Sequence, residues 1–437
     1  MDSARADTRF DGELVHVHVH RDDERALKAA NVPTARRIII AVENDAAALD
    51  MAMKAQSLFP KTRIAVHMDD LWLSRKVRSL AGAERLRSFT DATAAAREII
   101  RRHLPFLLAE DLGQTRIHSV LIGDHDWLEA LMVETIVTAC TLRYGKPAFT
   151  FFCADPHAFH DRLFTRYPDL ASAADIRVGQ VSVNAHSPLS MVQTEDLSLQ
   201  GPVTAVYCAL DDEAQSLATA IALRDLVQSD DAEVKAPIFV HMVGSGMARP
   251  APASRLAPLQ IVPFGDLSDI ARASDILSVH GDAAEQAWHK AYLSFAPDDK
   301  AASKPWDDLP EEFRLSNLRA VGHIYAKLFE AGFDLRPWLA THDSWKTLPA
   351  LAKGENIWRD EAEHLKLAVL EHERWIADRR MSGWVGGAVR DNQRKVHDNI
   401  VPFDELSEEL KSYDFKFVDI LAKVLPHAKD GLVRRAT

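Results

Sequence analysis

The sequence predicts an α/β region built on parallel sheets, followed by an all-α module of tandem repeats. Apolar segments of strand length alternate with helical segments through residue 268, and such alternation is typical of β-α-β units. Beyond that point helical periodicity continues without strand-like segments, and one helical motif occurs twice. We therefore expect two α/β domains at residues 1–110 and 111–268, and two helical repeats at residues 269–345 and 346–437.

The composition favours a cytoplasmic protein and excludes several classes. A net charge of −12 argues against binding to duplex nucleic acid, because that binding requires a basic surface. Cys140, Cys153 and Cys208 form no CxxC pair, so neither a disulfide framework nor a zinc site is indicated. No apolar run approaches the roughly 18 residues of a membrane helix, and the first ten residues are unlike a signal peptide.

The first α/β segment contains three strand-like stretches separated by helices. Residues 13–20, "ELVHVHVH", alternate strictly, whereas residues 36–42, "RRIIIAV", form the continuous apolar run of a buried parallel strand. A third strand is expected in "TRIAVHM". The histidines of the first strand share one face, but consecutive same-face residues stand about 6–7 Å apart. That spacing is too wide for a single zinc site at His16, His18 and His20.

Residues 26–70 resemble the second half of the regulatory nucleotide-binding domain of potassium-uptake proteins and potassium-channel gating rings. The shared pattern is a helix, an Ala-rich turn, an apolar strand, an acidic loop and a second helix. The resemblance implies a scaffold that forms homodimers or larger rings and gates a membrane transporter or channel. The family's first half, with its GxGxxG loop, is absent here. Either an upstream piece that carried this first half has been lost, together with membrane-spanning segments, or the domain has decayed.

A second α/β segment is expected to be Rossmann-like, and its sequence assigns no definite cofactor to it. At the end of its first strand the glycines of the dinucleotide fingerprint would fall at Gly123, His125 and Leu128. Only Gly123 is a glycine, so the fingerprint is vestigial. Leu128 and the neighbouring Trp127 would obstruct a dinucleotide phosphate. Asp211 and Asp212 are interpreted as helix caps rather than ligands. The strands are expected at residues 116–123, 147–154, 201–210 and 236–244.

The helical module contains an internal repeat. "PWDDLPEEFRLSN" at residues 305–317 matches "PFDELSEELKSYD" at residues 402–414 in character, and each stretch opens a helix. Pro310 suits the first helical position and Ser407 suits an N-cap. Upstream of these stretches, "WHKAY" and "EHERW" both place an aromatic residue three positions after a histidine.

The second copy resembles the ryanodine receptor repeat. Residues 367–414 follow its pattern through the H-x-x-W helix, the "GW" turn, the "G…RD" loop, "K-x-H" and "PF-x-x-L". The first copy lacks the loop and has Tyr292 in place of the tryptophan, so it is a degenerate copy. The resemblance implies a ligand- or nucleotide-sensing module in which tandem copies pack about a pseudo-two-fold axis with a cleft between them.

We predict a ligand site in this module. Under a pseudo-two-fold axis Tyr292 and Trp375 would face each other and form a slot for a planar ring. Basic residues follow on the same helix face and on the next loop, and arginine binds phosphate bidentately. The alternative for Trp375, Trp384 and His372 is ordinary core packing. The predicted ligand-binding residues are Tyr292, Trp375, Arg379, Trp384, Arg390, Asp391, Lys395 and His397.

The resulting hypothesis is a non-enzymatic cytoplasmic sensor without catalytic or metal-binding residues. Its C-terminal module would bind a nucleotide or a related anion, and its Rossmann-like scaffold would form homo-oligomers and transmit the signal. The protein would be the soluble part of a cation channel or transporter, or a sensor of a nucleotide second messenger in defence. The alternatives are an enzyme that uses a nucleotide cofactor in the α/β region and a purely structural oligomerisation protein.

Overall fold

The structure, a computed structural model, describes residues 37–77, 86–123, 126–180, 200–227, 236–242, 260–266, 283–294, 302–342 and 348–435. The chain divides into two compact units, Met1–Asp91 with Asp298–Leu315, and Ala92–Pro297 with Ser316–Thr437. The strand expected at residues 13–20, with His16, His18 and His20, lies outside the described residues. The division into four domains stays a prediction.

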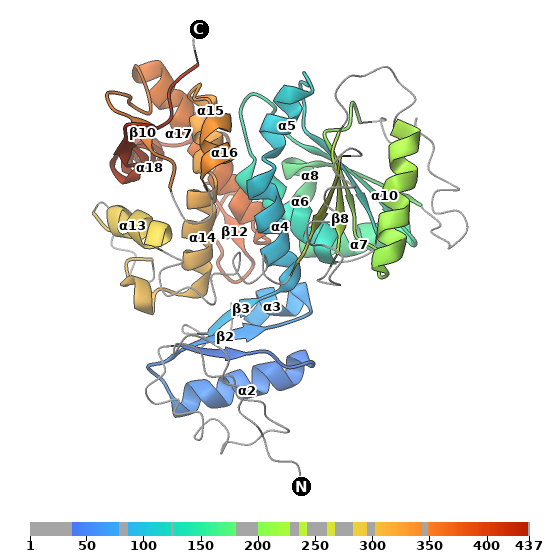
Figure 1. Cartoon of the computed structure of the whole chain (residues 1–437). Helices are drawn as coiled ribbons and strands as arrows, with labels where there is room; N and C mark the ends of the chain where they lie inside the picture. Colours follow the sequence, from blue (N-terminus) through green and yellow to red (C-terminus); the bar gives the residue numbers. More distant parts are fainter. Residues whose placement is uncertain are drawn as a thin grey trace. The chain divides into compact units, whose positions relative to one another are not determined.

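The first unit contains a three-stranded parallel sheet with the order β1-β2-β3 (Figure 1). Its apolar residues are in register, with Ile38 opposite Ile64 and Ile64 opposite Leu86. Helix α2 packs against β1 and β2 through buried alanines. The bounds are β1 Arg37–Ile40, α2 Asp45–Leu58, β2 Arg63–His67, α3 Leu71–Val77, β3 Leu86–Phe89 and the 3-10 helix η3 Trp306–Asp308.

The second unit contains a six-stranded parallel sheet with the order β6-β5-β4-β7-β8-β9. Counted along the chain this order is 3-2-1-4-5-6, that of dinucleotide-binding α/β folds, so the Rossmann-like prediction is confirmed. The six strands are β4 His118–Ile122, β5 Ala148–Cys153, β6 Asp175–Gln180, β7 Ala205–Cys208, β8 Ile238–His241 and β9 Ile261–Phe264. The helices of this region are α4 Asp91–Arg102, α5 Pro105–Asp111, α6 Asp126–Thr138, α7 Pro156–Arg166, α8 Leu170–Ala173 and α10 Glu213–Val227.

The point where the strand order reverses, between β4 and β7, is crowded. Gly123 ends β4 with φ of +133°, and a Cβ at this residue would lie 2.0 Å from the Ala209 carbonyl oxygen. Leu128 lies in van der Waals contact with the same position. The Trp127 ring is 3.8 Å from that of His241 at the end of β8. Gly123 thus permits two backbone segments to pack closely, and it has this structural use whether or not a ligand binds there.

Asp212 confirms its predicted role, because its carboxylate accepts a hydrogen bond from the Gln215 backbone N–H at the start of α10. The strands predicted at 116–123, 147–154, 201–210 and 236–244 correspond to β4, β5, β7 and β8. The two outer strands, β6 and β9, were not predicted from the sequence.

The C-terminal region is helical, as predicted, and adds four strands of two residues each. Phe106 of α5 packs against Phe329 of α15, with ring centroids 4.8 Å apart, so the helices share a core with the α/β region. The helices are α13 Ala283–Tyr292, α14 Glu311–Gly322, α15 Ile324–Glu330, α16 Arg336–Thr341, α17 Glu361–Met381, the 3-10 helix η4 Phe403–Glu405 and α18 Glu408–Val424. The short strands are β10 Leu351–Ala352, β11 Val385–Gly386, β12 Val396–His397 and β13 His427–Ala428.

The internal repeat is visible in the backbone. Pro305 and Pro402 precede the 3-10 helices η3 and η4 with nearly identical dihedral angles, φ −53° and ψ 151° against φ −54° and ψ 147°. Each 3-10 helix leads into an α-helix. Arg314 lies 5.8 Å from the centre of the Trp306 ring, and Lys411 lies 5.8 Å from that of Phe403. Matching residues therefore make matching contacts.

The start of the second repeat helix matches the prediction more closely than the first. The Ser407 hydroxyl accepts a hydrogen bond from the Leu410 N–H, as expected of an N-cap. Pro310 precedes the first helical residue and accepts a hydrogen bond from Arg314 N–H through its carbonyl. Pro310 is therefore the cap residue itself, one position before the expected place.

We predict that Gly123→Ala destabilises the second unit by more than Gly113→Ala. Both glycines have positive φ, and such sparsely populated backbone conformations cost a non-glycine residue about 1–3 kcal/mol. Only Gly123 also has a backbone atom in the place of the new Cβ, and overpacking adds about 1–3 kcal/mol. Urea unfolding of the two variants measures the difference. Equal losses would mean that the close approach of β4 and β7 has no energetic consequence.

Candidate functional site

Helix α17 carries the predicted site and is defined at both ends by local signals. The Asp360 carboxylate caps its first turn by accepting the Glu363 N–H at 2.9 Å. Gly383, with φ of +82°, ends the helix in a left-handed turn. The Trp384 N–H then bonds back to the Arg379 carbonyl at 3.0 Å. This turn returns the chain so that Trp384 lies beside the last turn of the helix.

Four predicted residues come together here in what we term the Trp–His–Arg cluster: Trp375, Arg379, Trp384 and His397. The Arg379 guanidinium carbon lies 5.5 Å from the Trp375 ring centre and 5.8 Å from the Trp384 ring centre. The His397 ring meets both indoles edge-on, at 5.0 and 5.7 Å between centroids. A cation held against two aromatic rings gains about 0.5–2 kcal/mol from the ring electrons.

The loop between β11 and β12 positions His397 and adds a second arginine. The Asp391 carboxylate accepts hydrogen bonds from the Gln393 and Arg394 N–H groups at 2.9 and 3.0 Å. Asp391 and Val396 exchange two backbone hydrogen bonds, so the loop closes as a hairpin. Arg390 is exposed and donates to the Asn392 side chain at 2.9 Å.

His397 is neutral at neutral pH. Burial, together with the positive charges of Arg390 and Arg379, lowers the pKa of His397 to about 4. The Asn399 N–H donates to its Nδ1 at 3.1 Å, which places the ring proton on Nε2. The cluster therefore combines the Arg379 guanidinium with one neutral imidazole N–H donor, and Arg390 on the neighbouring loop adds a second positive charge that acts on His397. Such a set of donors favours an anionic ligand.

Trp384 contributes a buried indole N–H to this cluster. The side chain is only 7% exposed, and its indole N–H has no hydrogen-bond partner among the described residues. A buried donor without a partner costs about 1–3 kcal/mol, and each such group in a native protein calls for an explanation. Trp375, by contrast, is half-buried and keeps part of its ring accessible.

Comparison with known protein families identifies the segment that holds this cluster. Residues 357–428 match the RyR domain. A second match covers residues 2–88, to the TrkA-N domain. Both agree with the resemblances seen in the sequence. Comparison with curated proteins gives no match. The RyR domain contains the whole Trp–His–Arg cluster, its loop and the cap of α17. Among the described residues, no helix is long and apolar enough to cross a membrane.

The remaining predicted residues lie in or beside the RyR domain but outside the cluster. Lys395 has φ of +54°, and its ammonium donates to the Ser382 carbonyl at 2.8 Å, so it joins the hairpin to the end of α17. Asp391 shapes the hairpin turn. Both residues hold the loop in place through these hydrogen bonds.

Tyr292 lies elsewhere, which corrects the expected arrangement of facing rings. Its ring stacks on Phe417 of α18 at 5.7 Å, with only 6° between the ring planes. Trp375 packs instead with Ile376, Trp384 and Ile400 in a separate small cluster. The slot between Tyr292 and Trp375 is therefore not formed in this structure. The two H-x-x-aromatic motifs do share their local geometry, with ring distances of 6.0 Å for His289–Tyr292 and 5.8 Å for His372–Trp375.

His372 is a satisfied core histidine, the alternative considered from the sequence. Its Nε2–H donates to the Val401 carbonyl at 2.8 Å, and its Nδ1 lies 3.4 Å from Asp414. Burial alone would lower the pKa of His372, but the bonds to Asp414 and Val401 outweigh burial and raise it. The ring therefore links α17 to α18 and to the segment before η4.

The adjoining face of α17, about 100° around the helix, carries a buried ionic network that the sequence reasoning missed. Glu371 accepts from Lys327 and from Arg374, each at 2.7 Å. Asp378 accepts from Arg319 and from the Ser316 hydroxyl. The signal was present in the sequence, because Glu371, Arg374 and Asp378 follow at helical spacing. We call Arg319, Lys327, Glu371, Arg374 and Asp378 the buried network; each is at most 6% exposed.

We predict that His397 makes stability depend on pH between about 6.5 and 4. Its pKa is about 4 in the folded state and about 6.5 in the unfolded state, so the unfolded chain binds a proton first as the pH falls. Stability is thus lost as the pH falls from 6.5 toward 4, by about 2 kcal/mol at pH 5. Urea unfolding at pH 7 and pH 5 should show a smaller loss in His397→Gln. Identical pH slopes in the two proteins would contradict this.

Lys327→Met should destabilise the second unit by about 3–5 kcal/mol, because it removes one partner of a buried ion pair. Lys411→Met is the matched control. Lys411 pairs with the exposed Glu408, and a surface pair contributes about 1 kcal/mol or less. Thermal and urea unfolding measure both losses. Similar values for the two variants would show that the Lys327–Glu371 pair does not stabilise the fold.

Proposed function

We propose that this protein is a ligand-sensing regulatory protein whose RyR domain binds a nucleotide or a nucleotide-like anion at the Trp–His–Arg cluster. The observation that supports the proposal most directly is the convergence of Arg379 and the neutral His397 on two indole rings, with the positive charge of Arg390 acting on His397. An anionic group would pair with the guanidinium groups, and the accessible part of Trp375 would stack on a planar base.

The unpaired N–H of Trp384 supports the same proposal. A ligand oxygen that accepted this proton would relieve the cost of the buried donor. The site is pre-formed in part, because Arg379 is already held between the rings and the hairpin is closed by its own hydrogen bonds. Pre-positioned groups lose less conformational entropy when a ligand binds.

The regulatory half of the proposal rests on the TrkA-N match, which suggests a regulatory domain of potassium transport. The end of α17 is also tied to the α/β region. Arg380 Nε donates to the Asp169 carboxylate at 2.6 Å, just before α8. Ligand that binds one arrangement of this junction more tightly would shift the population toward it. We extend the proposal to a homo-oligomer that controls a cation channel or transporter, or to a second-messenger sensor.

A thermal-shift screen of the purified chain against mono-, di- and cyclic nucleotides tests the function. A ligand at about 100 times its Kd should add about 2.7 kcal/mol of stability. Trp375→Ala should weaken the binding by about 1–3 kcal/mol, or roughly 5- to 150-fold in Kd, through lost stacking. Trp358→Ala is the matched control, since Trp358 stacks on His364 at 4.3 Å in the same domain but outside the cluster.

The variants also separate the alternatives. Tyr292→Ala should leave nucleotide binding unchanged, because Tyr292 packs on α18 in this structure. Equal losses of nucleotide binding in Tyr292→Ala and Trp375→Ala would instead support a binding slot between the two repeats. A shift that survives in Trp375→Ala would point to the α/β region, and the absence of any nucleotide-dependent shift would contradict the proposal and favour a structural scaffold.

A further inference from the structure

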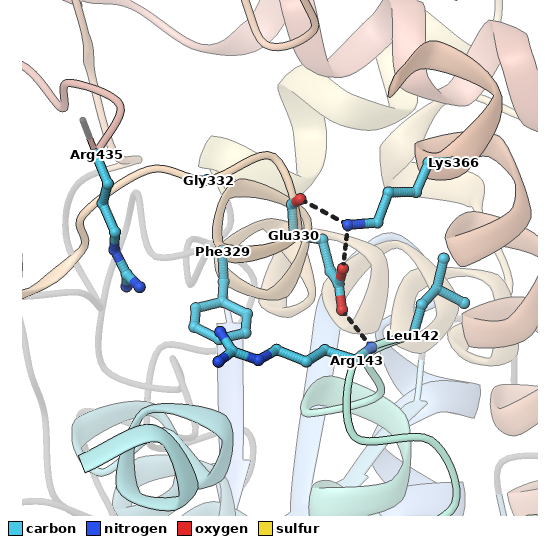
Figure 2. Close-up of a pocket in the computed structure, with 7 residues that line it drawn as sticks. All are labelled: Leu142, Arg143, Phe329, Glu330, Gly332, Lys366 and Arg435. Atoms are coloured by element: carbon cyan, nitrogen blue, oxygen red, sulfur yellow. Dashed lines mark hydrogen bonds and ion pairs between the residues drawn. The ribbon is translucent and has the colours of Figure 1, made fainter. Parts of the chain in front are cut away.

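A pocket of 420 Å³ lies away from the Trp–His–Arg cluster, where the helical region meets the α/β region of the second unit (Figure 2). Its volume is within the roughly 300–1,000 Å³ typical of small-molecule sites, which often lie at such junctions. Four segments supply its walls: the loop after α6, the end of α15, the second turn of α17 and the C-terminal segment. The lining residues are Leu142, Arg143, Phe329, Glu330, Gly332, Lys366 and Arg435.

Three cations from three of these segments surround the pocket, and their side chains are partly exposed. The side chains of Arg143, Lys366 and Arg435 are 54%, 43% and 33% exposed. Glu330 is the only acidic residue of the lining, and Glu110 lies behind two of the arginines. Among the lining residues, three positive charges face the single carboxylate of Glu330, and Glu110 is shared with Arg336, which does not line the pocket.

The two carboxylates hold the cations in position. Glu330, 2% exposed, accepts from the Lys366 ammonium at 2.6 Å and from the Arg143 backbone N–H at 2.7 Å, as Figure 2 shows. Glu110 accepts from Arg143 and Arg435 at 2.9 and 2.6 Å. Burial would raise the pKa of Glu110, but the bonds from Arg435 and Arg336 outweigh it and keep the pKa below its usual range. Glu110 therefore stays charged.

Each arginine uses one terminal nitrogen for Glu110, and a guanidinium group has five N–H donors. The remaining donors of Arg143 lie at the pocket, whereas Arg435 Nη2 is buried, so Arg435 contributes mainly its charge. Phe329 cannot serve as a stacking surface, because it is only 5% exposed and both guanidinium groups lie within 5.7 Å of its ring centre. Recognition here is therefore by charge and hydrogen bonding rather than by stacking.

We propose that this pocket binds a small phosphate-bearing anion through Arg143, Lys366 and Arg435. Guanidinium groups bind phosphate bidentately and the ammonium adds a compact charge, so the three cations suit the several oxygens of a phosphate or diphosphate group. The inference is independent of the nucleotide proposal. The bound anion would bridge the loop after α6, helix α17 and the C-terminal segment.

Titration calorimetry with inorganic phosphate and pyrophosphate, in sodium chloride of matched ionic strength, tests the pocket. Wild-type protein should show saturable binding in the titration, and its thermal unfolding with the anion present should show a rise in Tm. Arg143→Gln should weaken binding at least about tenfold, or about 1.4 kcal/mol. Its fold should persist, because Glu110 keeps Arg336 and Arg435 as partners. Lys366→Gln, which retains a hydrogen-bond donor for Glu330, should weaken binding in the same direction.

Arg116→Gln is the matched control. Arg116 is paired with Asp175, which keeps Lys146 as its other partner, and it does not line the pocket. Arg116→Gln and Arg390→Gln should both bind phosphate as the wild type does. The proposal is overturned if phosphate acts no differently from chloride, or if Arg143→Gln binds like the wild type. It is also overturned if only Arg390→Gln loses binding, because the anion would then occupy the RyR-domain cluster.

Discussion

The ion pair between Lys327 and Glu371 is the contact on which the arrangement of the helical region depends. Both side chains are fully buried, and Arg374 approaches Glu371 from the same helix. Burying separated charges is costly, so the pair tolerates only the geometry in which α15 and α17 bring the groups together. Residues on an α-helix are 100° apart, and fixing Glu371, Arg374 and Asp378 on one face fixes the rotation of α17. Their next neighbours along the chain, His372, Trp375 and Arg379, are consequently presented on the adjoining face.

The buried network also joins the helical region to the α/β region. His323 donates to the Cys140 carbonyl at 2.8 Å, and its other ring nitrogen accepts from Lys327 at 3.0 Å. The pKa of His323 is lowered by burial and by the positive charge of Lys327, so the ring stays neutral and can accept that proton. A chain of hydrogen bonds thus runs from the loop after α6 to α17. Both proposed ligand sites border this helix, which gives their occupants a shared rigid element to act on.

The sequence predicted the inner strands because β4, β5, β7 and β8 are buried at every residue and read as continuous apolar runs. The two outer strands escaped the prediction for a physical reason. In β6 no residue is fully buried, so "DIRVGQ" has neither an apolar run nor a clear alternation. In β9 the sequence includes Pro263, which lacks an N–H and is tolerated at a sheet edge. Edge strands pair on one side only, and their sequences are correspondingly less constrained.

The same distinction between local and long-range constraints explains the site. Trp375 and Arg379 are related by one helical turn, so spacing alone was sufficient to predict their association. The return of Trp384 to them depends on the Gly383 turn, which the structure shows. The position of Tyr292 depended on how two repeats pack. The Tyr292 ring stacks on Phe417 of α18, and no local sequence pattern specifies this contact. Native proteins rarely leave a buried donor such as the Trp384 N–H without a partner. The Trp384 N–H is one of several such buried atoms among the described residues, and its place beside Arg379 and His397 is what supports the proposed anion site there.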